Sequence, residues 1–310
     1  MRVVDLFSGC GGMAQGFVNA KFNIVAAYDN WEPAIEVYKK NFKHPIIKYD
    51  LGSKEAPIEI YRHKPDIIIG GPPCQDFSSA GRENYTRDRA SLIESYQNII
   101  EYNKPYLFVF ENVPRVRYNI LYINLKKHLS NLNYGMTEVI LNSAYCRVPQ
   151  IRKRLFLFGI MGEKDNVLLN DIENSLSKKK MTMRDYFGDS LGIDYYFRIP
   201  TNYKRKAVFS VEDPCVTIRG IDRPIPKNYK KHPDDLADVR DNVRILTVRE
   251  RSLVQTFPET FVFEGTKTNL NTMIGNAVPV KLAEFVANRL VHYLSNENMS
   301  AFLEKKCENC

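Results

Sequence analysis

Short aliphatic segments alternate with helical patterns through the first half of this 310-residue chain. Strands that alternate with helices form an open, mostly parallel α/β sheet, which binds its ligands beyond the carboxyl ends of the strands. The alternation stops after Gly162, where the composition changes. We therefore predict a Rossmann-like α/β fold followed by a smaller, irregular part. The expected strands are residues 3–7, 23–28, 46–51, 67–69, 106–110, 136–141 and 155–160.

Residues typical of a nucleotide site follow the first three strands. Ser8-Gly9-Cys10-Gly11-Gly12 turns from the first strand into a helix, and its glycines let a ligand approach the backbone. Asp29 follows about twenty residues later, where a carboxylate often holds ribose hydroxyls. Trp31 opens the next helix, either to fasten that helix to the core or to stack on an adenine. Asp50 either accepts from an adenine amino group or begins an ordinary turn.

A cysteine stands at the tip of the fourth strand, in Gly70-Gly71-Pro72-Pro73-Cys74-Gln75-Asp76-Phe77-Ser78. Two prolines stiffen the turn that carries it. The side chain is either a small buried thiol or a reactive one, and the turn alone leaves both open. The polar segment 76–89 is expected to be a loop that acts as a lid. Glu111 ends the next strand and is expected at the same sheet edge, as a solvated cap or as an acid that works with Cys74.

Two arginines flank Lys153 before the last expected strand of the sheet. Strand alternation sends Arg152 and Arg154 to one side and Lys153 to the other. They form either a basic edge strand, which resists aggregation, or a fork of cations that faces an anion or a carbonyl.

Much of the positive charge lies in one later segment. The chain has 44 Lys and Arg against 36 Asp and Glu, a net charge of +8, and residues 201–231 alone carry +5. Tyrosines and prolines interleave with these cations, which favours a nucleic-acid surface over a solvated insertion. We expect a catalytic and cofactor domain over residues 1–162 and 275–310, and a small domain with its hinge over 163–274.

Other classes of protein fit the sequence poorly. No apolar run reaches about 18 residues, so no transmembrane helix is expected, and the N-terminus does not resemble a signal peptide. The six cysteines are scattered, which fits a reducing, cytoplasmic setting. The pair in Cys307-Glu308-Asn309-Cys310 has no second pair, so no metal site is expected. A monomer is the default for this plan.

Six motifs, in order along nearly the whole chain, resemble those of the cytosine-C5 DNA methyltransferases of bacterial restriction–modification systems. The resemblance implies a Rossmann-like S-adenosylmethionine-dependent methyltransferase sheet with a small target-recognition domain. It also implies double-stranded DNA as substrate and functional pairing with a restriction endonuclease. The motifs are residues 5–12, 71–78, 111–113, Gln150 with Arg152 and Arg154, 249–258 and 275–279.

The same resemblance assigns roles to individual residues. Cys74 is the nucleophile that adds to C6 of a flipped-out cytosine, and Glu111 is the acid at N3. Arg154, or otherwise Arg152, stabilises charge at O2. The cofactor residues, with Asp29 on the ribose and Asn30 or Trp31 near adenine, are Phe7, Gly9, Gly11, Asp29, Asn30, Trp31, Asp50, Leu51, Pro72, Asn276 and Val278. The residues expected on DNA are Ser78, Arg82, Thr217, Arg219, Arg223 and Lys227.

Three alternatives remain at this point. The short region between residues 162 and 246 suits an RNA (tRNA) cytosine-C5 methyltransferase of the related branch, although the Cys-Phe-Thr motif of that branch is missing. A nicotinamide or flavin oxidoreductase shares the α/β plan, but the chain has no GxGxxG turn. An inactive DNA-binding module is disfavoured because Cys74, Glu111 and Arg154 are all present.

Overall fold

The computed structural model describes residues 1–73, 86–202 and 205–295, with the backbone alone for 86–91. The chain forms two compact units. The first comprises residues 1–141, 153–176 and the chain from Ala283 on, and the second comprises 142–152 and 177–282. These boundaries differ from those of the predicted functional domains, chiefly at 142–152, 163–176 and 275–282. The division into catalytic and recognition domains stays a prediction.

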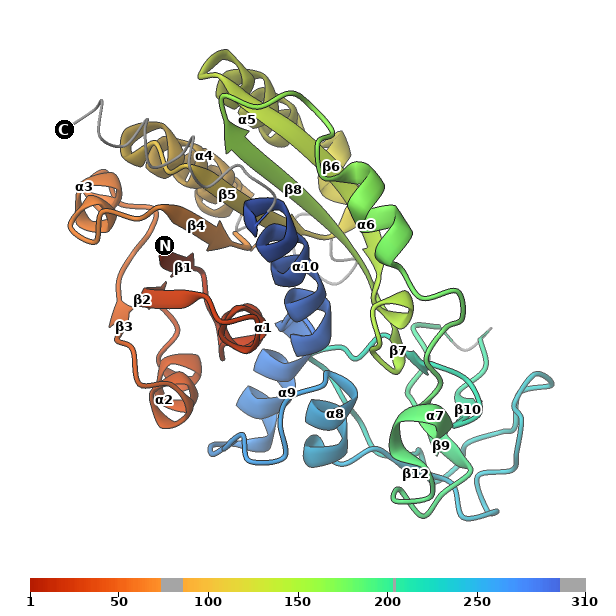
Figure 1. The fold of residues 1–310 in the computed structure, drawn as a ribbon. Helices are drawn as coiled ribbons and strands as arrows, with labels where there is room; N and C mark the ends of the chain where they lie inside the picture. Colours follow the sequence, from red (N-terminus) through yellow and green to blue (C-terminus); the bar gives the residue numbers. More distant parts are fainter. Residues whose placement is uncertain (74–85, 203–204, 296–310) are drawn as a thin grey trace. The chain divides into compact units, whose positions relative to one another are not determined.

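A seven-stranded sheet forms the centre of the first unit (Figure 1). Its strand order is β3-β2-β1-β4-β5-β8-β6. The pairs β1–β2, β2–β3, β1–β4 and β4–β5 are parallel, whereas β8 runs antiparallel to β5. The predicted α/β fold with a parallel-rich sheet is therefore confirmed. The strands are β1 (Arg2–Leu6), β2 (Asn23–Asp29), β3 (Ile46–Lys48), β4 (Ile67–Gly70), β5 (Leu107–Asn112), β6 (Tyr134–Asn142) and β8 (Lys153–Met161).

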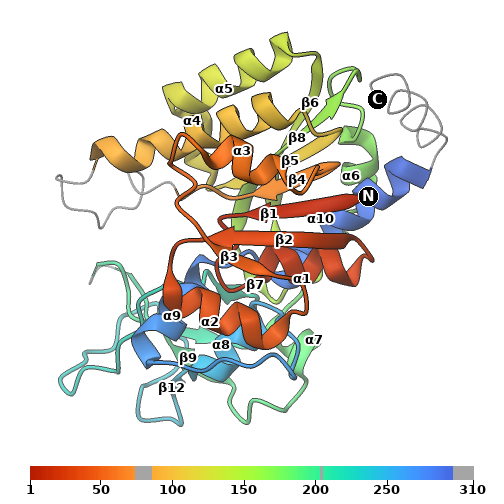
Figure 2. The same cartoon turned by 90° about the vertical axis from the view of Figure 1, so that its left-hand side faces the viewer.

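The central strands are apolar because helices cover both faces of the sheet. Every residue of β4 and β5 is buried, as expected for parallel strands between two helical layers. Helices α3, α4 and α5 lie on one side of the sheet, and α1 and α10 lie on the other (Figures 1 and 2). The helices are α1 (Gly12–Asn19), α2 (Glu32–Asn41), α3 (Ala56–Tyr61), α4 (Thr86–Asn103), α5 (Ile120–Asn131), α6 (Leu169–Ser175) and α10 (Val280–Tyr293), with the 3-10 turn η2 (Pro114–Tyr118).

Helix α4 begins earlier than the sequence predicts. The loop was expected to reach residue 89, but residues 86–89 are already helical, so the prediction is wrong there. The charged run Thr86-Arg87-Asp88-Arg89 looks like a polar loop. Arg, however, is a good helix former, and acidic residues are favoured in a first helical turn. Among the described residues, no helix is long and apolar enough to cross a membrane.

The second unit has small sheets and short helices. The strand order β10-β9-β12 forms one sheet, and β11 pairs in parallel with β7 in another. A small core of Phe197, Ala207, Val208, Ala237 and Val243 supports the first of these. The elements are η3 (Ser143–Tyr145), β7 (Gln150–Ile151), α7 (Met183–Phe187), β9 (Tyr195–Phe197), β10 (Val208–Ser210), β11 (Cys215–Val216), β12 (Arg244–Ile245), α8 (Val248–Val254) and α9 (Lys267–Asn276).

Candidate active site

Glu111 and Arg154 form a buried ion pair at the carboxyl end of β5. The antiparallel register sets Asn112 opposite Leu155, so Arg154 on β8 stands just beyond the end of β5. Arg154 Nε lies 2.9 Å from Glu111 Oε1, and the two side chains are 15% and 12% exposed. Burial lowers the pKa of Arg154, and the Glu111 carboxylate opposes that shift. The structure thus brings together two of the predicted catalytic residues.

The same strand end holds the turn that leads to the predicted nucleophile. Asn112 Nδ2 donates to the carbonyl oxygen of Pro72 at 2.9 Å, and Asn112 Oδ1 accepts from Val113 N at 2.8 Å. A Cβ added at Gly71 would lie 2.8 Å from Glu111 Oε2, so a side chain there would displace the carboxylate. The sequence analysis gave Asn112 no role, because a motif does not show which carbonyl an amide meets.

Several predicted residues lie outside the described part of the chain. They are the nucleophile Cys74, the DNA contacts Ser78 and Arg82, and the C-terminal pair Cys307 and Cys310. Their roles stay predictions.

Arg152 has different partners from Arg154. It lies between β7 and β8, is 1% exposed, and donates through Nη1 to Ile218 O at 3.0 Å and through Nη2 to Gly275 O at 2.8 Å. The two arginines therefore do not share a partner, and the expected alternation along one strand is not observed at Arg152. The strand is interrupted at Arg152, so the alternation of side chains does not continue through it. Arg154 is the arginine that contacts Glu111.

The turn after β1 has an unusual backbone. Phe7 has φ of +56°, and Gly9 and Gly11 have φ of +54° and +93°. A left-handed phenylalanine is strained, and such strain is concentrated at ligand sites. A Cβ at Gly9 would meet no atom within 4 Å among the described residues, so space adjoins this glycine. The turn therefore leaves backbone open to a ligand.

Asp29 ties this turn to the start of α2. Its Oδ2 accepts from Gly9 N and its Oδ1 accepts from Trp31 N, both at 2.8 Å. Burial raises the pKa of Asp29, and these backbone hydrogen bonds partly offset the rise. Trp31 is half-buried at the N-cap of α2, and Asn30 is exposed beside it.

Asp5 is a buried carboxylate that the sequence analysis did not single out. It is 1% exposed, and its Oδ2 has no hydrogen-bond partner among the described residues. Burial raises the pKa of Asp5 well above its ordinary value, and the nearby Asp29 raises it further. The available signal was an acid inside an otherwise apolar strand.

The remaining predicted cofactor residues occupy varied settings. Asp50 Oδ1 accepts from Gly52 N at 2.9 Å, which is the turn-forming bond considered for it. Leu51 is 3% exposed and belongs to the core. Asn276 is exposed and Val278 is buried, and both lie in the second unit.

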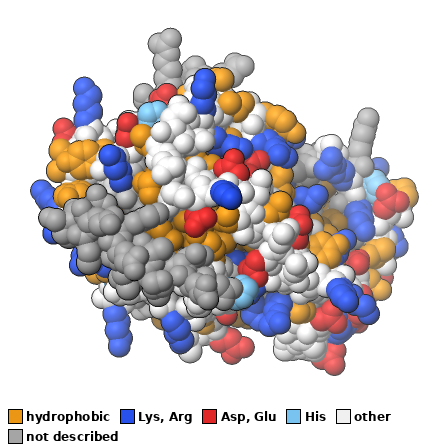
Figure 3. Space-filling view, turned by 45° about the horizontal axis from the view of Figure 1, so that its top comes forward, with side chains coloured by type: hydrophobic (Ala, Val, Ile, Leu, Met, Phe, Trp, Pro, Cys, Tyr) orange, Lys and Arg blue, Asp and Glu red, His pale blue; other side chains and the backbone are white. Residues whose placement is uncertain are grey.

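The predicted DNA contacts of the second unit are not all free. Thr217 Oγ1 donates to Ile151 O at 2.7 Å, and Arg219 Nη2 donates to Ile199 O. Arg223 and Lys227 are exposed. On the face drawn in Figure 3, Lys and Arg side chains are spread over the surface and Asp and Glu lie among them. Charge on this face therefore does not mark out a single patch.

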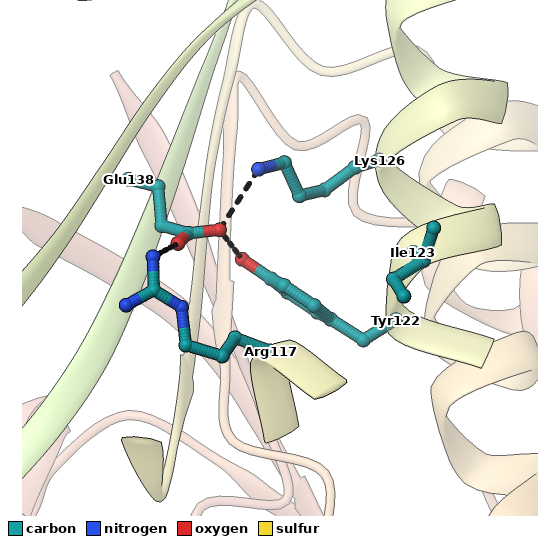
Figure 4. Close-up of a pocket in the computed structure, with 5 residues that line it drawn as sticks. All are labelled: Arg117, Tyr122, Ile123, Lys126 and Glu138. Carbon is teal, nitrogen blue, oxygen red and sulfur yellow. Dashed lines mark hydrogen bonds and ion pairs between the residues drawn. The ribbon is translucent and has the colours of Figure 1, made fainter. Parts of the chain in front are cut away.

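A surface pocket of about 190 Å³ in the first unit is separate from these residues. In Figure 4, Arg117, Lys126 and the Tyr122 hydroxyl converge on Glu138, at 3.1, 2.9 and 2.6 Å. Burial opposes the ionisation of Glu138, but these partners hold its pKa below the ordinary value. The carboxylate is satisfied within the protein, and none of the predicted site residues lines the pocket.

Comparison with known proteins shows which family the chain belongs to. The family model described as C-5 cytosine-specific DNA methylase matches residues 1–292. The chain belongs to this family. It is a DNA (cytosine-5-)-methyltransferase, as the six motifs predicted.

Curated relatives and solved structures agree with this assignment. The enzyme is 48% identical over 295 residues to Type II methyltransferase M.HindV of Haemophilus influenzae, covering 94% of this chain and 97% of that protein. It is 47% identical over 300 residues to M.HgiDI of Herpetosiphon aurantiacus, covering 96% and 97%. A putative DNA modification methyltransferase from an E. coli prophage shares the fold, with TM-score 0.70, 21% identity and coverage of 96% and 100%. The S. pombe Dnmt2 methyltransferase does so with TM-score 0.73, 19% identity and coverage of 95% and 99%.

Proposed function

We propose that this enzyme transfers a methyl group from S-adenosylmethionine to C5 of a flipped-out cytosine in a specific duplex DNA sequence, through a covalent bond between Cys74 Sγ and C6. The observation that carries the proposal is the end of β5. There Glu111 meets Arg154, and Asn112 holds the carbonyl of Pro72, two residues before Cys74. An acid, a cation and the base of a cysteine-bearing turn are held by one strand end.

The turn after β1 fits the nucleoside part of this cofactor. The strained Phe7, the space beside Gly9 and the buried carboxylate of Asp29 supply shape and an acceptor, and Trp31 supplies an aromatic wall. When bound, S-adenosylmethionine supplies an electrophilic methyl group. The rest of the proposed set is Gly11, Asn30, Asp50, Leu51, Pro72, Asn276 and Val278, as the family motifs imply.

The residues of the chain make C5 reactive. The Cys74 thiolate forms a bond to C6, the C5–C6 π electrons become available at C5, and a proton from Glu111 is taken up at N3. The second oxygen of Glu111 accepts from the N4 amino group, which selects cytosine over thymine. Arg154 stabilises the charge that develops at O2. After transfer, the C5 proton passes to water or hydroxide, the N3 proton returns to Glu111, and elimination of the Cys74 thiolate restores the aromatic base.

A stacked base is out of reach of this site, so the cytosine has to leave the duplex, which costs a few kcal/mol. Ser78 and Arg82 are proposed on phosphate, and the second unit is proposed to read the sequence through Thr217, Arg223, Lys227 and their neighbours. Because the relatives described above are named Type II methyltransferases, we place the enzyme in a restriction–modification system. It would act in the cytoplasm as a monomer, alongside an endonuclease of the same specificity.

A trapping experiment tests the proposal. A duplex with 5-fluorocytosine at the target, incubated with tritiated S-adenosylmethionine, blocks loss of the C5 substituent and should leave a stable covalent adduct. Cys74→Ser should abolish the adduct, and an adduct that survives this change overturns the assignment of the nucleophile. Methyl transfer to tRNA but not to duplex DNA would overturn the assignment of duplex DNA as the substrate.

A further inference from the structure

The second unit contains three arginines that lie close together with too few acids to balance them. This arginine cluster consists of Arg198, Arg219 and Arg251. Arg219 Nη2 donates to the carbonyl oxygen of Ile199, the residue after Arg198, and Arg251 Nη2 donates to Arg219 O. Arg251 is only 5% exposed, while Arg198 and Arg219 are half-buried. Among the described residues, the carboxylate that pairs with the cluster is Asp222, whose Oδ1 lies 3.5 Å from Arg251 Nη1. The cluster therefore keeps a net charge of about +2.

The other ionisable groups beside the cluster do not neutralise it. Burial raises the pKa of the Cys215 thiol to about 11, so the thiol is neutral at physiological pH. Burial likewise raises the pKa of the Tyr196 hydroxyl well above its ordinary value. Burial lowers the pKa of Arg198 to about 10, and the charges of Arg219 and Arg251 contribute. The cluster is thus electrostatically unfavourable without a further anion.

Several donors of the cluster are unused. Nε of Arg219 and Nε of Arg251 are buried without a hydrogen-bond partner among the described residues. Within the described residues, the Arg198 guanidinium has neither a hydrogen bond nor an ion pair. Buried donors are nearly always satisfied, so the two unsatisfied Nε groups of Arg219 and Arg251 indicate a missing acceptor. Guanidinium groups match the geometry of phosphate oxygens particularly well.

The backbone beneath the cluster is held firmly. Arg251 Nη2 donates to Arg219 O, and Ile218 N donates to Gln150 Oε1 at 2.9 Å. Arg152 Nη1 donates to Ile218 O at 3.0 Å. Buried side chains thereby fix the segment that carries Arg219, so the cluster is preorganised and loses little entropy when it binds.

We propose that Arg198, Arg219 and Arg251 form a phosphate site, and that its occupant is a phosphate of the DNA backbone. The inference rests on the proposed function, and it moves Arg219 from base reading to anchoring. A phosphate contact carries no sequence information, but it sets the register of the neighbouring residues on the duplex. Occupation supplies the negative charge and the acceptors that the cluster lacks. In the free protein, repulsion among the three arginines lowers stability, and the same three charges strengthen DNA binding.

Arg198→Gln tests the site, and Arg240→Gln is its control, because Arg240 is 85% exposed and pairs with Asp238. Inorganic phosphate should raise the melting temperature of the wild-type protein and of Arg240→Gln, and should do so little in Arg198→Gln. Without phosphate, Arg198→Gln should melt at or above the wild-type temperature, because one of the repelling charges is gone. Against duplex DNA, the slope of log affinity on log salt should fall by about 0.9 in Arg198→Gln and stay unchanged in Arg240→Gln.

The possible results separate the explanations. A lower melting temperature with an unchanged salt slope would overturn the proposal in favour of a structural role. If Arg198→Gln no longer responds to inorganic phosphate but keeps the wild-type salt slope of DNA binding, the site binds phosphate from a source other than DNA, and the DNA part of the proposal is overturned. Arg198→Lys keeps the charge and should keep the slope, which serves as a check if Arg198→Gln is poorly folded. Adduct formation by the wild-type enzyme reports on the proposed function separately, since it involves no change in the cluster.

Discussion

Glu111 takes its position from neighbours on three segments of the first unit. Arg154 on β8 holds one oxygen, and Gly71 leaves room for the other. Asn112, the next residue of β5, donates to the carbonyl oxygen of Pro72, two residues before Cys74 in the chain. At this scale the proposed chemistry depends on spacing set by single atoms, because a misplacement of about 1 Å costs roughly a hundredfold in rate.

Asn112→Asp should slow formation of the covalent adduct about tenfold, because loss of one buried donor costs of order 1–3 kcal/mol. The change keeps the size of the side chain but removes the donor to Pro72 O. It places a carboxylate oxygen against the Pro72 carbonyl oxygen, and both atoms are acceptors. Asn103→Asp is a matched control, since Asn103 Nδ2 donates to Pro57 O at 3.0 Å away from the site. Rapid-quench trapping with the fluorinated duplex measures both rates, and equal slowing in the two variants would contradict a specific role.

Gly71→Ala should lower methyl transfer about a hundredfold while DNA affinity stays the same, because the added methyl group displaces the Glu111 carboxylate. A double-mutant cycle checks this route. In a Glu111→Ala background the carboxylate is already missing, so Gly71→Ala should cost little more. Independent, additive losses would show that Gly71 acts by another route.

At the scale of elements, the turn between β1 and α1 combines strain with buried charge. Phe7 is left-handed, Asp29 accepts from Gly9 and Trp31, and Asp5 lies in β1. Burial and the nearby Asp29 both make ionisation of Asp5 unfavourable, which lowers the stability of this element at neutral pH. Such a cost is typical of a segment selected to bind a ligand rather than for stability.

Asp5→Asn should stabilise the protein at neutral pH, and the gain should shrink toward pH 4. Burial raises the pKa of Asp5 in the folded state. As the pH rises above about 4, the unfolded chain ionises Asp5 while the folded chain does not, so the folded state loses stability.

Asp235→Asn should show the opposite trend. Burial opposes ionisation of Asp235, but hydrogen bonds from Tyr229 and backbone amides hold its pKa below the ordinary value. The native carboxylate therefore stabilises above about pH 4, and that contribution is lost as the pH falls.

Urea unfolding of both variants, from well below pH 4 up to neutral pH, checks the two signs. If Asp5→Asn and Asp235→Asn had the same pH trend, the assigned pKa direction of at least one of the two carboxyls would be wrong.

At the scale of the whole molecule, the first unit holds the ion pair and the strained turn, while the second holds the arginine cluster and the basic segment. The proposed enzyme divides its tasks accordingly, with chemistry on a parallel sheet and DNA binding on short strands and loops. Parallel strands deliver several side chains to one rigid edge, whereas loops tolerate changes in sequence and so suit recognition.

Lys227→Ala should reduce the salt slope of DNA binding by about 0.9, because one phosphate contact is lost. Lys164→Ala is the control, since this exposed residue follows β8 at the end of the strand away from Arg154. Fluorescence anisotropy over a range of salt concentrations measures both slopes. Equal slopes in Lys227→Ala and the wild type would remove Lys227 from the DNA surface.

The α/β plan, the family and the residue types of the chemistry were all predictable from the amino-acid sequence. Aliphatic periodicity is a local property, so β4 and β5 could be recognised from a few residues each. The motifs identified Glu111 and Arg154 by their resemblance to the family, and the pairing of β5 with β8 brings the two side chains together. The predicted loop before α4 extends to residue 89 and so includes residues 86–89, which are helical, because polarity alone does not distinguish a loop from an exposed helical turn.

The contacts of the polar side chains were not predictable, and the folded structure was needed to find them. It gives Arg152 and Arg154 different partners. It also assigns Asn112 to the Pro72 carbonyl and gathers Arg198, Arg219 and Arg251. These contacts join residues that are distant in the chain, and their partners are mostly backbone carbonyls, which every residue type carries. A sequence pattern therefore contains no signal for them. The energy of a buried charge depends on which atoms surround it, and only the folded chain sets that.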